Sequence, residues 1–167
     1  MIGRLVIIVL GLIGAAGFGQ GPEIATQYQQ RLGGAIDELE QIIAQFDADA
    51  SKNGLDREQA LAIYARSPEP FLRDRGVSMA HAVERYETLT RQVTAFSTAH
   101  DFYKPVYLAL EADAKLLDGV MHDYTVGLPA TASGLLYGGV GGLFGYLFGG
   151  LLRAIAGGRR RSASQQI

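Results

Sequence analysis

Two long stretches without a charged residue, one near each end of the chain, constrain the fold more than any other feature. The first runs from Leu5 to Pro22, 18 residues, and the second from Tyr124 to Leu152, 29 residues. As α-helices they would be about 27 Å and 43 Å long, against a bilayer hydrocarbon core of about 30 Å. We therefore predict an all-α protein with two transmembrane helices, residues 1–21 and 124–156, around a soluble helical domain, 22–123. A polar, disordered tail, 157–167, would follow.

The charges are segregated in the same way. All 17 acidic residues and ten of the 15 basic ones lie between Glu23 and Asp123, a net charge of −7. Because basic residues flank the cytoplasmic ends of membrane spans, the remaining five predict that both termini are cytoplasmic and that the middle domain is periplasmic. These five residues are Arg4, Arg153, Arg159, Arg160 and Arg161.

The N-terminal stretch also admits another interpretation. Arg4, the apolar run and the small residues Ala15, Gly17 and Gly19 fit a cleaved signal peptide loosely. The absence of cysteine excludes disulfides, thiolate metal sites and cysteine nucleophiles.

The middle stretch has the pattern of paired helices. A first helix should begin at Pro22 and end near Gly54, with Gly33 and Gly34 allowing a neighbour to approach closely. Asp56, with Gln59, should cap a short helix. Ser67 and Pro68 should start another long helix, and Leu108–Tyr124 a last one. The two long helices carry apolar residues at spacings of three and four, which predicts an antiparallel, coiled-coil-like hairpin. The two sets are Tyr28, Leu32, Ala35, Leu39, Ile42 and Phe46, and Met79, Ala82, Tyr86, Leu89, Val93 and Phe96.

Glycines in the second apolar stretch give the clearest candidate site. Small residues four apart form a flat helix face on which another helix packs closely in a membrane. One interpretation is that the two spans simply pack on each other within one chain. Such packing would use one face, so two offset rows favour the other interpretation, in which an additional partner or a second copy binds as well. The rows are Gly134, Gly138 and Gly142, and Gly141, Gly145 and Gly149, with a weaker matching row, Gly11, Ala15 and Gly19, in the first span.

Two metal-site alternatives are weaker. Asp47, Asp49, Ser51, Asn53 and Glu58 have calcium-loop spacing, but Lys52 stands where that loop needs glycine. A frayed helix end with a Gly54 C-cap explains the same residues.

The other alternative is a metal-dependent enzyme around two pairs, His100–Asp101 and His122–Asp123. No ligand pair at helical spacing accompanies them. Placement at the membrane interface explains His122 equally well.

Other functions lack their sequence signals. There is no nucleotide-binding loop, serine elbow or catalytic dyad, so we expect neither an enzyme nor a cofactor. The spans hold no internal ionisable residue, which argues against coupled ion transport. The Arg159–Arg161 cluster fixes topology or attracts anionic lipid, and an acidic domain does not favour nucleic acid.

Four segments resemble a known family. They are Pro22–Gly34, Phe46–Ala50, Ser67–Arg73 and Asp123–Pro129. In this order they resemble bacterial membrane proteins grouped as domain of unknown function 2937. Gly127 stands where relatives are expected to have proline. The resemblance implies a proteobacterial inner-membrane protein and no established activity.

The favoured function is therefore a non-enzymatic membrane protein that binds or scaffolds a partner. The glycine-rich span would make contact within the bilayer and the acidic helices outside it. A small homo-oligomeric channel or mechanosensitive protein lined by that span is the alternative.

Overall fold

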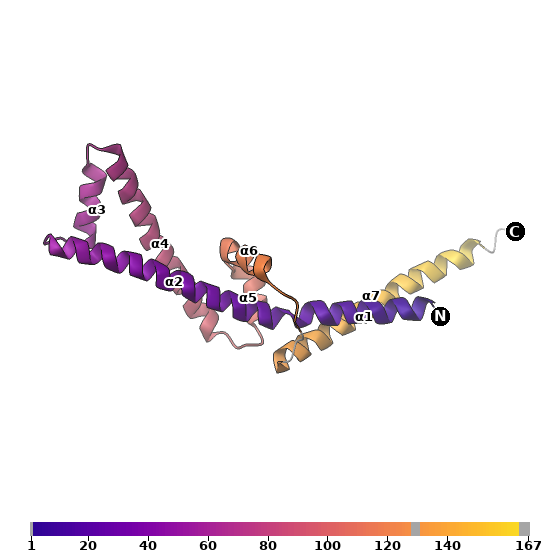
Figure 1. Cartoon of the computed structure of the whole chain (residues 1–167). Helices are drawn as coiled ribbons and strands as arrows, with labels where there is room; N and C mark the ends of the chain where they lie inside the picture. The colour runs from indigo at the N-terminus through magenta and orange to yellow at the C-terminus, as the bar shows by residue number, and fades with distance from the viewer. Residues whose placement is uncertain (1, 128–130, 164–167) are drawn as a thin grey trace. The chain divides into compact units, whose positions relative to one another are not determined.

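The computed structural model describes residues 2–127 and 131–163, and within these ranges all regular structure is helical (Figure 1). The prediction of an all-α protein is therefore confirmed for the described chain. Leu128, Pro129 and residues 164–167, which include the end of the predicted tail, lie outside the described residues. The helices are α1 (Ile2–Gly19), α2 (Gly21–Lys52), α3 (Arg57–Arg66), α4 (Pro70–Thr98), α5 (Lys104–Glu111), α6 (Ala114–Asp123) and α7 (Ala132–Ala163).

The chain forms two compact units. One combines residues 1–27 with residues 100–167, and the other is the continuous stretch 28–99. We call the first the span unit and the second the hairpin unit. The boundaries differ from the ends of the predicted soluble domain, 22–123, because α5 and α6 group with the apolar helices rather than with α3 and α4.

In the span unit, α1 and α7 pack against each other in opposite directions (Figure 1). Ile7 lies against Gly149, Leu10 against Gly145 and Gly14 against Gly141, so residues later in α1 meet residues earlier in α7. Both helices are long and apolar enough to cross a membrane. α7 continues to Ala163, seven residues past the predicted end of the second span.

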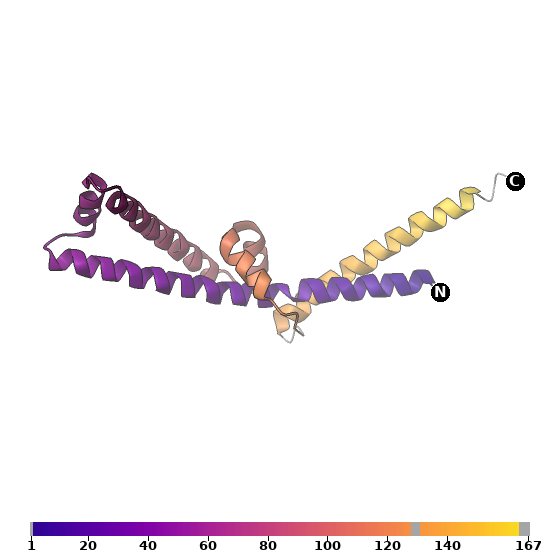
Figure 2. The ribbon, with the colours of Figure 1, turned by 45° about the horizontal axis from the view of Figure 1, so that its top comes forward.

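In the hairpin unit, α2 and α4 run in opposite directions and come together where Tyr28 meets Phe96 (Figure 2). Both side chains are fully buried, their ring centroids lie 5.7 Å apart, and the Tyr28 hydroxyl donates a hydrogen bond to Gln92 Oε1 at 3.0 Å. At its other end, α3 leads from α2 to α4 and packs on α4. The unit is thus a wedge of three helices.

The predicted apolar positions on α4 are all buried or half-buried, but one on α2 is wrong. Ile42 is 43 % exposed, whereas Ile43 is only 5 % exposed. The buried apolar residues of α2 beyond Tyr28 are Leu32, Ile43 and Ala50. Their spacing fits a straight helix of 3.6 residues per turn rather than the 3.5 of a supercoil, so the buried face moves by one position.

The turn between α2 and α3 forms as its sequence predicts. Gly54 has a φ of +71°, and the Leu55 amide donates to the Ala50 carbonyl at 3.0 Å, which is a Schellman C-cap. Asp56 accepts from the Gln59 amide at 2.8 Å, and the Gln59 side chain accepts from the Asp56 amide at 3.0 Å. The predicted capping box is confirmed.

Two predicted helix boundaries are wrong. α4 begins at Pro70 with Glu69 as its N-cap, while Ser67 ends α3. The predicted last helix, Leu108–Tyr124, is two helices, because Asp113 accepts a hydrogen bond from the Leu116 amide and caps α6. Pro105 lies in the first turn of α5, where a missing amide hydrogen costs nothing.

Candidate helix-packing interface and cavity

Backbones of α1 and α7 meet directly at the row Gly141, Gly145 and Gly149. A Cβ built on Gly141 would lie 2.3 Å from the Gly14 carbonyl oxygen, and one on Gly145 would lie 2.1 Å from the Leu10 oxygen. A Cβ on Gly149 would lie 2.9 Å from the Ile7 Cα. Since side chains do not tolerate such distances, only glycine allows this approach.

The second row lies against the same helix. A Cβ on Gly138 would lie 3.2 Å from the Ala15 oxygen, and one on Gly142 would lie 3.4 Å from the Ala15 Cβ and 3.5 Å from the Gly11 oxygen. Gly134 is also buried. Two offset rows predict that one stays available for a partner, but Gly138 and Gly142 of the second row lie against α1 of the same chain, as the first row does.

Gly14 is a contact residue that the sequence reasoning missed. A Cβ on it would lie 2.2 Å from the Gly141 oxygen. The predicted row of α1 contains only residues four apart, Gly11, Ala15 and Gly19. The three-residue step from Gly11 to Gly14, which also keeps residues on one helix face, was the available signal.

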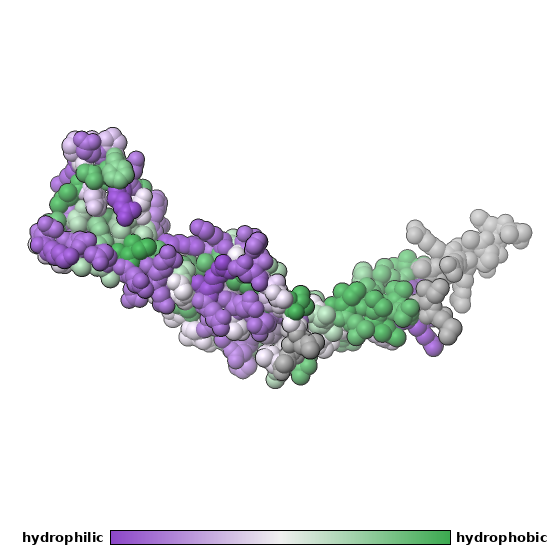
Figure 3. Space-filling view, in the orientation of Figure 1, coloured by the Kyte–Doolittle hydropathy of each residue, from purple (hydrophilic) through white to green (hydrophobic). Residues whose placement is uncertain are grey.

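The rest of the pair presents an apolar outer surface (Figure 3). Gly17, Gly139 and Gly150 have no neighbour within 4 Å of a built Cβ, so these glycines face outward. Large exposed side chains, such as Leu12, Leu135 and Leu143, surround them. Such a surface suits lipid chains.

A polar cluster closes one end of the pair. Gln20, just after α1, is the buried polar residue of the described chain. Its amide nitrogen donates to the Gly127 carbonyl at 2.9 Å, and its amide oxygen accepts from the Tyr124 hydroxyl and, at 3.3 Å, from the Gly127 amide. These bonds fix the chain that leads towards α7. At the other end, Arg153 packs over Gly3, with its Cδ 3.2 Å from a built Cβ.

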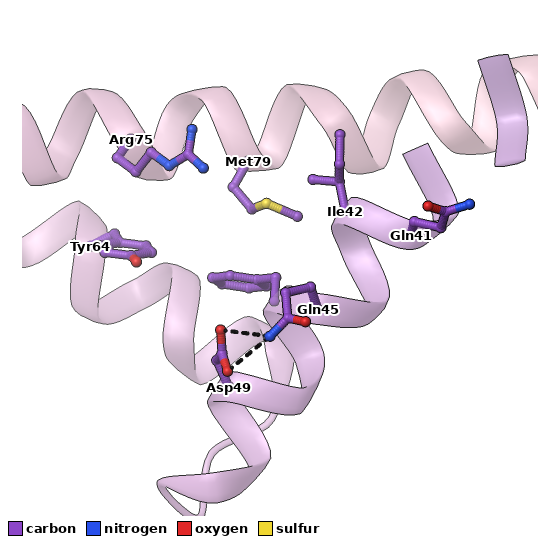
Figure 4. Close-up of a pocket in the computed structure, with 8 residues that line it drawn as sticks. Gln41, Ile42, Gln45, Asp49, Tyr64, Arg75 and Met79 are labelled. Carbon is purple, nitrogen blue, oxygen red and sulfur yellow. Dashed lines mark hydrogen bonds between the residues drawn. The ribbon is translucent and has the colours of Figure 1, made fainter. Parts of the chain in front are cut away.

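The hairpin unit contains an open cavity of about 440 Å³ inside the wedge (Figure 4). Phe46 and Tyr64 stack at its floor, with ring centroids 6.1 Å apart. Arg75, on α4, is one of its lining residues. The other lining residues are Gln41, Ile42, Gln45, Asp49 and Met79.

The calcium-loop alternative does not fit the structure. Residues 47–52 are helical, so no loop wraps around an ion. Asp47 instead accepts two hydrogen bonds from Arg57, at 2.8 and 2.5 Å, which lower the pKa of its carboxyl group. Asp49 accepts from Gln45 and Lys52.

The histidines pair locally. His122 Nδ1 lies 3.0 Å from Asp123 Oδ1, and His100 Nδ1 accepts from the Phe102 amide. Among residues 2–127 and 131–163, no group of three His, Asp or Glu side chains is arranged to hold a metal ion.

Comparison with known protein families gives one match, which covers both apolar helices and everything between them. Residues 2–162 match the model of one family, described as "Protein of unknown function (DUF2937)". The chain belongs to the DUF2937 family. The resemblance inferred from the four segments is thereby confirmed. No curated protein and no solved structure matches this DUF2937 chain.

Proposed function

We propose that this DUF2937 protein is a non-enzymatic protein of the bacterial inner membrane that holds a partner-binding helical unit beside the bilayer. One observation carries the proposal. Five of the six glycines in the two rows of α7 lie against α1, so the two spans make an anchor complete within one chain: Gly138, Gly141, Gly142, Gly145 and Gly149. Partner binding then falls to the part outside the membrane rather than to a spare glycine face.

The cavity of the hairpin unit is the best surface for a partner protein. It combines stacked aromatic rings with the apolar side chains of Ile42 and Met79, and Arg75 stands at its edge. Partner proteins insert apolar anchors into such hollows, while charged groups at the rim orient them. The occupant we propose is an amphipathic helix with an apolar anchor.

The channel alternative has less support. A pore lined by α7 needs faces of α7 that meet other copies, and the rows best suited to this are covered by α1.

Mild detergent extraction of tagged protein tests the proposal with two matched variants. Ile42→Glu places a charge in the cavity at a half-exposed position, and Gly139→Leu enlarges an outward position of α7. We expect the wild type and Gly139→Leu to retain a bound partner. Ile42→Glu should lower the affinity for this partner by about 30-fold or more, as the loss of an interface anchor does. The proposal is contradicted if the tagged wild-type protein is purified without any partner. It is also contradicted if Gly139→Leu loses the partner and Ile42→Glu retains it.

A further inference from the structure

Helix α5 carries an exposed apolar stripe within the span unit. Tyr103, Val106 and Leu110 follow one another at spacings of three and four residues, so they share one face of the helix. All three are exposed, and Leu110 is 76 % exposed. On the other side, Leu108 is buried. The helix is thus apolar on both its packed face and an outer face.

Contacts fix α5 beside the ends of both membrane helices. Phe102, just before α5, lies against Tyr137 of α7, with ring centroids 5.1 Å apart, and its carbonyl accepts a hydrogen bond from the Tyr137 hydroxyl. Pro105 lies 3.2 Å from a Cβ built on Gly21, two residues after α1 ends. The stripe therefore belongs to the region where the chain leaves the apolar helices.

We propose that the stripe formed by Tyr103, Val106 and Leu110 lies in the interface of the lipid bilayer, so that α5 is a membrane-surface helix. Exposed apolar side chains in water cost free energy, whereas the boundary between head groups and acyl chains accepts them. Tyrosine rings concentrate at this depth because one end is apolar and the other polar.

The net charge of residues 100–123 indicates whether the lipid contact is apolar or electrostatic. Residues 100–123 contain Lys104 and Lys115 and five acidic residues, a net charge of −3. Anionic head groups would repel such a segment, so the contact depends on apolar burial and not on charge attraction. The inference rests on the proposed embedding of α1 and α7, and its test measures that embedding separately.

The chain contains no tryptophan, which permits a clean fluorescence experiment. Three single-tryptophan variants are reconstituted in phosphatidylcholine vesicles with nitroxide-labelled lipids. Leu110→Trp probes the stripe. Phe71→Trp is the matched control, since Phe71 is 77 % exposed but lies in the hairpin unit. Leu143→Trp probes the outer face of α7. Gel filtration and helicity check folding, and Val106→Trp replaces Leu110→Trp if that variant misfolds.

In phosphatidylcholine vesicles, we expect shallow labels to quench Leu110→Trp at least about three-fold more than Phe71→Trp, without dependence on salt. Added anionic lipid should not increase this quenching. Deep labels should quench Leu143→Trp most strongly. Equal quenching of Leu110→Trp and Phe71→Trp, with Leu143→Trp quenched deeply, overturns the inference and leaves the anchor intact. An unquenched Leu143→Trp overturns both. Quenching of Leu110→Trp only with anionic lipid overturns the apolar mechanism.

Discussion

The two units of this DUF2937 protein hold their helices together in opposite ways. In the hairpin unit, large side chains fill the space between helices, as Tyr28 and Phe96 do. In the span unit, α1 and α7 meet where side chains are absent, as at Gly14 and Gly141. In water, burial of apolar area drives helices together, whereas in lipid this drive is absent and close backbone packing replaces it. The packing of the span unit is therefore the kind that suits lipid, and that of the hairpin unit is the kind that suits water.

Glycine itself illustrates the difference. Gly33 and Gly34, in the middle of α2, have no neighbour within 4 Å of a built Cβ, so the prediction that they admit a close neighbour is wrong. Gly76 of α4 does have one, because a Cβ there would lie 2.6 Å from the Tyr64 Cβ. In the hairpin unit, a glycine thus makes room for one side chain at a single place. In the span unit, glycines bring the two backbones together along the whole contact between α1 and α7.

The largest expected effect is the loss of stability when a buried side chain is removed from the hairpin unit. Phe96→Ala deletes a fully buried ring that packs on Tyr28, and we expect it to lower the free energy of unfolding by about 3–5 kcal/mol. Phe71→Ala removes the same atoms from an exposed position and should change it by less than about 0.5 kcal/mol. Thermal unfolding followed by helicity measures both. Equal effects would mean that the Tyr28–Phe96 contact does not hold this unit together.

Adding a side chain should damage the span unit. Gly145→Ala places a methyl group 2.1 Å from the Leu10 oxygen and must push α1 and α7 apart, at a cost of about 1–3 kcal/mol. Gly139→Ala adds the same group where no atom lies within 4 Å and should be neutral or slightly stabilising. Thermal stability in detergent distinguishes them, and a Gly145→Ala protein as stable as Gly139→Ala would refute the close approach.

The smallest effect concerns the ion pair between Asp47 and Arg57. The Arg57 side chain holds the pKa of Asp47 below 3.8, so the pair stabilises the fold above pH 3.8 and loses this effect as the pH falls through the lower folded pKa. Both side chains are more than one-third exposed, so Asp47→Asn should cost only about 0.5 kcal/mol at pH 7. Unfolding curves of the two proteins should converge in strong acid. A difference that persists there would assign the effect to something other than this charge.

Local chemistry made part of this fold predictable from the sequence. The Gly54 turn and the Asp56–Gln59 box depend on residues within a few positions, and both form as expected. The split at Asp113 follows the same capping chemistry, but a continuous apolar pattern concealed it. By contrast, the position of α3 depends on tertiary contacts such as Phe46 with Tyr64, which no local pattern encodes.

The candidate site was predictable in composition but not in arrangement. Glycine spacing indicated which faces of α7 pack closely. It could not indicate that both rows would face α1, because helix register and crossing depend on Gly14 and Leu10 as well. Likewise, hydropathy could not indicate that α5 lies beside α1 and α7, because this depends on tertiary contacts of Phe102 and Pro105.

The most direct test of the central claim is a disulfide between α1 and α7. The chain has no cysteine, and the Ala15 Cβ lies 3.4 Å from a Cβ built on Gly142, close to disulfide geometry. Mild oxidation of Ala15→Cys/Gly142→Cys in membranes should cross-link the chain to itself and leave a monomer of altered gel mobility. The control Ala15→Cys/Gly139→Cys should not form this bond within the chain. A cross-linked dimer of the first variant, or no cross-link at all, would contradict an anchor completed by a single chain.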